Sequence, residues 1–218
     1  MKQPLTILSE LPSGFFELET GGILELFPTP TLIQLKGDRS PALFVSILLH
    51  GNEYSGLKIM QSVLARYPDL LPRSLSLFIG NVEAAAANCR TLPSQPDFNR
   101  CWPGSEMEQN PVTEMLQSLV HELVRNGLYA AIDIHNNTGA NPHYACLTDV
   151  TQDNQHLASM FNHIGLVFKR PRGVSTMAFD GVCPAATLEC GRPGEALGIS
   201  HGSEMIDALL HMDHFPQR

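Results

Sequence analysis

The 218-residue chain lacks the features of several protein classes. It has no apolar run long enough to cross a bilayer, and 43% hydrophobic with only 17% charged residues excludes a disordered chain. Lys and Arg are scarce, at 14 against 22 Asp and Glu, which gives a net charge of −8 with histidine neutral. Nucleic acid and membrane surfaces are therefore not expected as partners, because both attract clustered basic residues.

The sequence also lacks a C-x-x-C pair and a signal peptide. An odd number of cysteines is typical of a reducing compartment, and we expect these side chains to be small buried hydrophobes. The first four residues carry no charged head, apolar run or cleavage site, so a cytoplasmic location is expected. The five cysteines are Cys89, Cys101, Cys146, Cys183 and Cys190.

No repeat, low-complexity stretch or linker divides the chain, which predicts a single domain over residues 1–218. A chain of this length buries about 70% of its unfolded surface and needs no metal to hold a core. Any metal site would therefore serve function. The sequence carries no signal of oligomeric state.

Short apolar runs bounded by breakers alternate with amphipathic stretches. Buried strands are predicted at residues 41–49, 74–79, 128–134 and 184–190, and helices at 53–65, 112–126, 153–163 and 198–211. This alternation predicts an α/β fold of three layers, α/β/α, with a mixed, largely parallel central sheet. Residues 5–36, which contain Gly21-Gly22 and alternating stretches, predict a leading antiparallel hairpin at the sheet edge.

His50-Gly51-Asn52-Glu53 follows the first of these strands and opens a helix. Ligand sites of α/β sheets lie at such carboxyl ends. A glycine between the two side chains allows a tight turn, so that the imidazole and the carboxylate can converge on one zinc ion. The alternative is that Glu53 only favours the helix N-terminus through its charge.

Asp133-Ile134-His135 ends the third strand, and residues two apart in a strand point to the same face. A carboxylate beside a metal-bound imidazole fixes its tautomer. With His135 as third ligand, the set of two His and one Glu leaves a position for water, which is a catalytic zinc pattern. The alternative is a hydrogen-bonded His135 without metal.

A loop without periodicity spans residues 91–110 and carries Asp97-Phe98-Asn99-Arg100-Cys101-Trp102. Long loops inside compact domains usually carry function. The planar fork of Arg100 suits a substrate carboxylate, with Asn99 as a neutral neighbour. The alternatives are an ion pair between Arg100 and Asp97, and Trp102 as a packing anchor rather than a binding platform.

Glu189 interrupts the last apolar strand just before a glycine. A carboxylate there is costly to bury unless it faces a polar cleft. It is a candidate general base for an attacking water, and the alternative is a charge at an exposed strand end.

In this order, the motifs H-G-N-E, D-F-N-R-C-W-P-G, D-I-H-N-N-T-G and T-L-E-C-G resemble the succinylglutamate desuccinylase/aspartoacylase family, a branch of the zinc carboxypeptidase-like fold. Residues 22–28 also look like that family's leading strand. The resemblance implies that His50, Glu53 and His135 bind one zinc per chain and that Glu189 is the catalytic carboxylate.

It further implies that Asn99 and Arg100 hold the substrate's α-carboxylate and that an upstream arginine, here Arg90, polarises the scissile carbonyl. Only 29 residues follow Glu189, so we expect a form without the family's C-terminal β domain. The expected activity is hydrolysis of an amide beside a free carboxylate, with an N-acyl amino acid as substrate. A carboxypeptidase or murein peptide amidase acting on a short peptide, and a non-catalytic zinc- or ligand-binding module, remain the alternatives.

Overall fold

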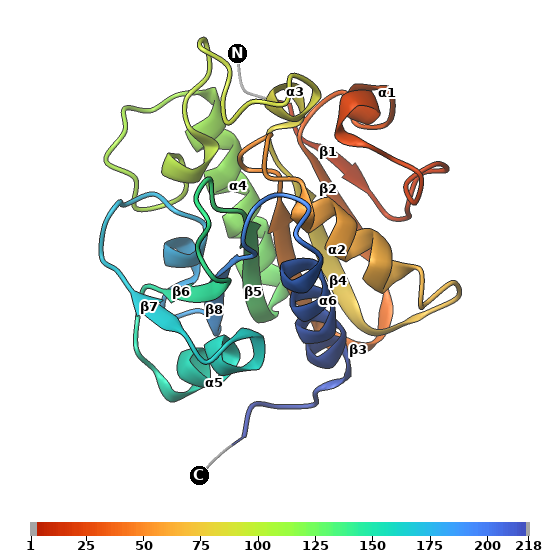
Figure 1. Cartoon of the computed structure of the whole chain (residues 1–218), viewed down its shortest axis with the longest axis vertical. Helices are drawn as coiled ribbons and strands as arrows, with labels where there is room; N and C mark the ends of the chain where they lie inside the picture. The colour runs from red at the N-terminus through yellow and green to blue at the C-terminus, as the bar shows by residue number, and fades with distance from the viewer. Residues whose placement is uncertain (1–3, 217–218) are drawn as a thin grey trace.

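The computed structural model describes residues 4–216, which form an eight-stranded sheet in the order β1-β2-β4-β3-β5-β8-β6-β7 (Figure 1). The strands are β1 Thr6–Leu8, β2 Thr31–Leu35, β3 Gly37–Ile47, β4 Leu71–Ile79, β5 Leu128–His135, β6 Tyr144–Leu147, β7 Gly165–Val167 and β8 Ala185–Glu189. The helices are α1 Ile23–Leu26, α2 Ser55–Leu64, α3 Val82–Ala86, α4 Pro111–Asn126, α5 Gln152–Phe161 and α6 Ala196–His211.

The four central strands β4, β3, β5 and β8 run parallel to one another. Antiparallel pairs flank them, β2 with β4 on one side and β6 with β8 on the other. Helices α2, α5 and α6 lie in front of the sheet in Figure 1 and α4 lies behind it. This confirms the predicted α/β/α fold with a mixed, largely parallel sheet.

Alternation along the central strands builds two cores. In β3, Leu43, Val45 and Ile47 face the core under α2 and α6, whereas Phe44 faces the core under α4. Successive side chains of a strand point to opposite faces, so a strand covered on both sides is apolar at most of its positions. This explains why residues 41–49 are almost continuously apolar in the sequence.

Trp102 lies at the centre of the core on the α4 side and is completely buried. Its ring packs edge-on against Phe44 and Phe78, with centroids 6.3 and 6.0 Å away, and at a tilt against Phe179. The interpretation of Trp102 as a packing anchor is confirmed, and through it the 91–110 loop is fixed to the sheet.

The predicted leading hairpin is wrong. β1 pairs with β2 in parallel, and β2 finds its antiparallel partner in β4, far along the chain. Residues 22–28 form no strand, because Ile23–Leu26 is a short helix whose Ile23 enters the core. Strand β6 and the edge strand β7 were not predicted, since runs of four and three residues carry too little periodicity.

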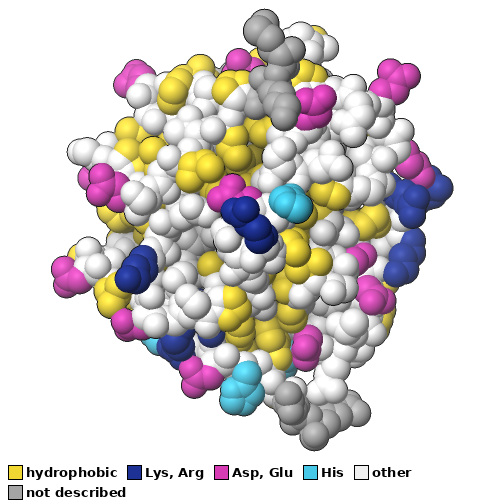
Figure 2. Space-filling model, turned by 180° about the vertical axis from the view of Figure 1, so that it is seen from behind, with side chains coloured by type: hydrophobic (Ala, Val, Ile, Leu, Met, Phe, Trp, Pro, Cys, Tyr) yellow, Lys and Arg dark blue, Asp and Glu magenta, His cyan; other side chains and the backbone are white. Residues whose placement is uncertain are grey.

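Within residues 4–216, none of the helices combines the length and the apolar character needed to span a membrane. Figure 2 shows the side of the molecule turned away in Figure 1. Basic and acidic side chains are interspersed over that face rather than gathered by sign.

We predict that Trp102→Ala lowers the free energy of unfolding by about 3–5 kcal/mol, because it empties a packed aromatic site. Urea denaturation measures the change. Phe16→Ala is the control, since 45% of Phe16 is exposed and its loss should matter far less. Equal losses in the two variants would contradict the packing role of Trp102.

Candidate active site

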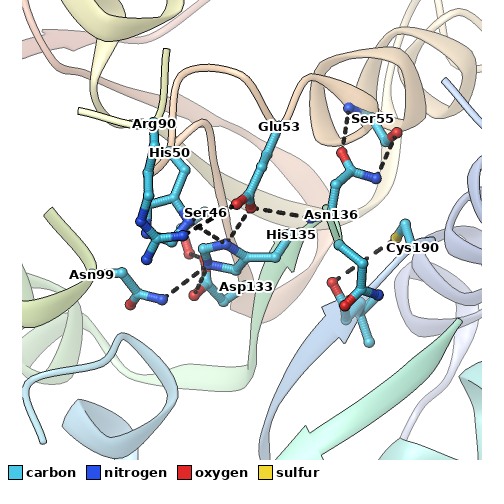
Figure 3. Close-up of polar contacts among 12 residues, drawn as sticks. Ser46, His50, Glu53, Ser55, Arg90, Asn99, Asp133, His135, Asn136 and Cys190 are labelled. Atoms are coloured by element: carbon cyan, nitrogen blue, oxygen red, sulfur yellow. Dashed lines mark hydrogen bonds and ion pairs between the residues drawn. The ribbon is translucent and has the colours of Figure 1, made fainter. Parts of the chain in front are cut away.

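Three neighbouring parallel strands, β3, β5 and β8, deliver the candidate residues to one edge of the sheet. Ser46 pairs with Asp133 across β3 and β5, and His135 pairs with Glu189 across β5 and β8. His50 follows β3 after a short turn. His50, Asp133 and His135 meet at the carboxyl ends of β3 and β5, as the sequence predicts (Figure 3).

The turn between β3 and His50 is built from unusual backbone. Leu48 adopts a left-handed φ of 56°, which is strained for a bulky residue, and its carbonyl accepts a 2.7 Å hydrogen bond from the Asn81 N–H. A Cβ on Gly51 would lie 2.1 Å from the backbone of Ala84 and Ala85. The glycine is therefore required by close contact with α3, not by the conformational freedom that the sequence suggested.

His50, Glu53 and His135 converge in a buried cluster, the triad of candidate ligands. Glu53 lies two residues before α2 rather than in its first turn, which corrects the prediction. Its carboxylate oxygens lie 2.9 Å from Nδ1 of His50 and 2.7 Å from Nδ1 of His135. The two Nδ1 atoms are 3.1 Å apart. The three residues can offer their ligand atoms to one ion.

Each imidazole has a carboxylate on its other nitrogen. Nε2 of His50 lies 3.1 Å from Oδ1 of Asp97, and Nε2 of His135 lies 2.8 Å from Oδ2 of Asp133. Glu53 lies against both Nδ1 atoms in the same way, so each imidazole has a carboxylate at both of its nitrogens. With the hydrogens on Nε2, donated to Asp97 and Asp133, both Nδ1 lone pairs and the Glu53 carboxylate are available to one cation.

The local field favours positive charge at this point. Burial alone would raise the pKa of Glu53, but the imidazoles of His135 and His50 hold it well below its usual range. Burial would lower the pKa of His135, yet Asp133 and Glu53 raise it well above its usual value. Two imidazoles with a carboxylate are a donor set that suits zinc, so the residues fit the metal that the sequence implies.

Glu189 lines the same cavity as the triad, a space of about 370 Å³. Burial raises the pKa of its carboxyl group, with Glu53 and Asp133 adding to the rise and the ring of His135 opposing it. A carboxyl group with a raised pKa in a cleft has the properties of a general base.

Arg90 and Asp97 form the rim beside the triad. Nη2 of Arg90 donates to Oδ2 of Asp97 at 3.0 Å, and Nη1 lies 3.6 Å from Oε1 of Glu53. Half of the Arg90 side chain remains exposed to the cavity mouth. Asp97 thus pairs with His50 and Arg90, and the suggested ion pair between Asp97 and Arg100 is absent among the described residues.

Arg100 and Asn99 also line the cavity. Arg100 donates to the carbonyl oxygen of Asn99 at 2.6 Å, which leaves other N–H groups of its guanidinium for a ligand. The amide of Asn99 is more constrained, because its Oδ1 accepts from the Ser175 N–H and its Nδ2 lies 3.1 Å from Nε2 of His135. Asn99 is buried between these neighbours.

Sequence reasoning missed several cavity residues. Arg170 lies on the segment before β8, far from any motif, and Asn136 follows His135 without a periodic signal of its own. The contact between Asp97 and His50 was also missed. The sequence showed Asp97 in the 91–110 loop but gave no sign that this loop reaches His50. His143 lies outside the cavity lining, and its Nε2 is 2.7 Å from Nδ1 of His201.

The family model of the succinylglutamate desuccinylase/aspartoacylase catalytic domain matches residues 39–189, more than half of the chain. That segment contains the triad, Arg90, Arg100 and Glu189. No curated protein matches the sequence significantly.

Solved structures share the fold at low identity. Succinylglutamate desuccinylase from Chromobacterium violaceum is 19% identical, with a TM-score of 0.66, over 83% of this chain and 64% of that one. The product-bound ectoine utilization protein EutE from Ruegeria pomeroyi is 19% identical, with a TM-score of 0.67, over 82% and 59%. A metallo-carboxypeptidase from Burkholderia cenocepacia is 16% identical, with a TM-score of 0.61, over 90% and 67%. The chain therefore spans less than two thirds of the length of the desuccinylase and of EutE.

We predict that the wild type binds one zinc per chain and that the double variant His50→Ala,His135→Ala binds none, because two of three ligands are lost. Both should fold, since the core does not depend on metal. Elemental analysis gives the metal content and circular dichroism checks the fold.

The control is His121→Ala,His214→Ala, which removes two exposed histidines and should leave zinc binding unchanged. Stoichiometric zinc in the His50→Ala,His135→Ala protein would refute the triad as the metal site.

Proposed function

Because the chain belongs to the succinylglutamate desuccinylase/aspartoacylase family, we propose that it is a zinc-dependent hydrolase of an amide bond beside a free carboxylate, acting on an N-acyl amino acid. One observation carries the proposal. The triad, the carboxylate of Glu189 and the guanidinium groups of Arg90 and Arg100 face one cavity of about 370 Å³. A site that only binds metal needs neither a general base such as Glu189 nor two arginine side chains beside it.

His50 and His135 would hold zinc through Nδ1, and Glu53 through its carboxylate. When bound, the metal supplies Lewis acidity, which polarises a carbonyl and favours attack by water at neutral pH. With zinc bound, Asp97 and Asp133 would accept hydrogen bonds from Nε2 of His50 and of His135, which leaves both Nδ1 lone pairs for the metal.

Glu189 would take the proton of the attacking water and return it to the leaving nitrogen. Its raised pKa supports this role, because a base works best when its pKa approaches the working pH. Arg90, half exposed at the cavity mouth, would stabilise negative charge that develops on the carbonyl oxygen. Asp97 fixes the guanidinium of Arg90 in that position.

Arg100 would bind the substrate carboxylate through its free N–H groups, since a guanidinium matches a carboxylate with two parallel hydrogen bonds. Asn99 supports it, because the Asn99 carbonyl accepts from Arg100 while its side chain is held by Ser175. Arg170, whose guanidinium pairs with Glu106 at 3.0 Å, lines the same cavity. Three arginines in one cavity of an acidic chain favour an anionic substrate.

The test is a hydrolysis screen of the zinc-loaded protein against N-acyl amino acids with varied acyl groups. C-terminal dipeptides belong in the same screen, because a metallo-carboxypeptidase shares the fold. Turnover of N-acyl amino acids alone supports the proposal, and turnover of dipeptides alone would favour a carboxypeptidase. Zinc binding without turnover of either would favour a binding module.

Glu189→Gln should retain zinc and lower kcat by about 10²–10⁴-fold, because glutamine keeps the shape but cannot accept a proton. KM should change little, since Glu189 is not assigned to ground-state binding. Zinc content and turnover are measured on the same preparation. Full zinc with undiminished turnover would remove Glu189 from the mechanism.

Stability provides the control for this variant. A carboxyl group whose pKa is raised in the folded state is most stabilising when protonated, below its unfolded pKa of about 4.3, and that contribution is lost as pH rises through the folded pKa. In the metal-free proteins, Glu189→Gln should therefore raise Tm at pH 7, and the gain should vanish at acid pH. A loss of Tm at pH 7 would show that the variant damages the fold.

Arg100→Lys should raise KM and lower kcat/KM, because the charge survives but the bidentate geometry does not. Esterifying the substrate carboxylate should then harm the wild type much more than the variant. Kinetics of both proteins on both substrates give the comparison. Equal losses on esterification would argue that Arg100 does not contact that carboxylate.

A further inference from the structure

Asn136 joins three segments of the site although no role has been assigned to it. Its side chain is buried, and its backbone N–H donates to Oε2 of Glu53 at 3.0 Å. Its side-chain oxygen accepts from the Ser55 N–H at 3.2 Å, and its amide nitrogen donates to Oγ of Ser55 and to the carbonyl of Gly191, both at 3.0 Å (Figure 3). Every polar group of the side chain is used.

The start of α2 explains why these contacts matter. The first N–H groups of a helix have no partner within the helix and need a cap. Tyr54 occupies the capping position of α2 and its side chain makes no capping hydrogen bond. Asn136 provides that cap from the end of β5, and so it fixes the position from which Glu53 reaches the triad.

The same side chain also holds the segment that follows Glu189. The carbonyl of Gly191 accepts from the Asn136 side chain and from the Asn137 N–H at 2.8 Å. Oγ of Ser55 accepts in addition from the Gly194 N–H at 3.1 Å. The beginning of α2 and the end of β8 are thereby tied to a single residue next to His135.

We propose that Asn136 is a positioning residue that locks the ligand Glu53 and the base Glu189 into one arrangement around His135. The inference rests on the proposed function for the roles of Glu53 and Glu189. The structural coupling between the start of α2 and the segment after β8 does not depend on catalysis.

The test compares Asn136→Ala with Asn154→Ala in the full chain. Asn154 is equally buried and bridges the start of α5 to the start of β8, through the carbonyl of Asp149 and the Ala185 N–H. Both variants lose a buried asparagine with hydrogen bonds to two segments. Asn154 lies outside the cavity lining, so its loss should lower Tm only.

Asn136→Ala should raise the zinc dissociation constant about 10–100-fold, the usual effect of removing support from a ligand. It should also lower kcat more than it changes KM. Competition with a chromogenic chelator measures the zinc affinity. An unchanged zinc dissociation constant, with a Tm loss like that of Asn154→Ala, would overturn the proposal.

Hydrogen exchange of the metal-free proteins gives the second readout. Asn136→Ala should accelerate exchange at both residues 53–56 and 189–195, whereas Asn154→Ala should affect neither. Acceleration in one segment alone would overturn the coupling. Because this readout needs no metal, a wild type that binds no zinc would defeat the proposed function alone.

Should Asn136→Ala fail to fold, Ser55→Ala keeps the proposal testable. It removes a partner of Asn136 without changing the cavity lining. It should raise the zinc dissociation constant above that of the wild type and accelerate exchange in the same two segments. Unchanged zinc affinity and exchange in Ser55→Ala would contradict the proposal.

Discussion

The Nδ1 atoms of His50 and His135 lie 3.1 Å apart where both side chains are largely buried, and the Glu53 carboxylate lies against both of them. Three groups that can each offer a lone pair are thus packed together, which is costly unless a proton or a metal cation lies between them. The surrounding groups hold this arrangement. Asp97 and Asp133 each contact Nε2 of one imidazole, and the Asn136 N–H donates to the Glu53 carboxylate.

The sheet holds these side chains rigidly in position. Asp133 accepts from the hydroxyl of Ser46 at 2.6 Å, which links β5 to β3 directly behind the triad. The Cys190 N–H donates to the carbonyl of His135, which extends the pairing of β5 and β8 beyond Glu189. Asp133 and Glu189 are therefore paired with neighbouring strands on both sides, which opposes small rearrangements that would separate the site residues.

The sequence predicted the central strands, the main helices and the triad because each has a strong local signal. His135 and Asp133 share a face by simple alternation, and His50 follows an unmistakable apolar run. The first 36 residues were misread, because pairing β2 with β4 is a long-range choice that local alternation does not encode. Asn136 was missed for the same reason, since its hydrogen bonds reach Ser55 and Gly191, which are distant in the sequence.

The environment of Glu189 shows how the cavity selects one base. Tyr144 and Cys146 lie on the adjacent strand β6, and burial together with the charge of Glu189 raises the pKa of each to about 12. Both groups stay protonated and neutral near pH 7, so they do not compete with Glu189 for protons. Burial also raises the pKa of Glu189, at a cost in stability while it is ionised. A base of useful strength and a less stable fold therefore have the same physical origin.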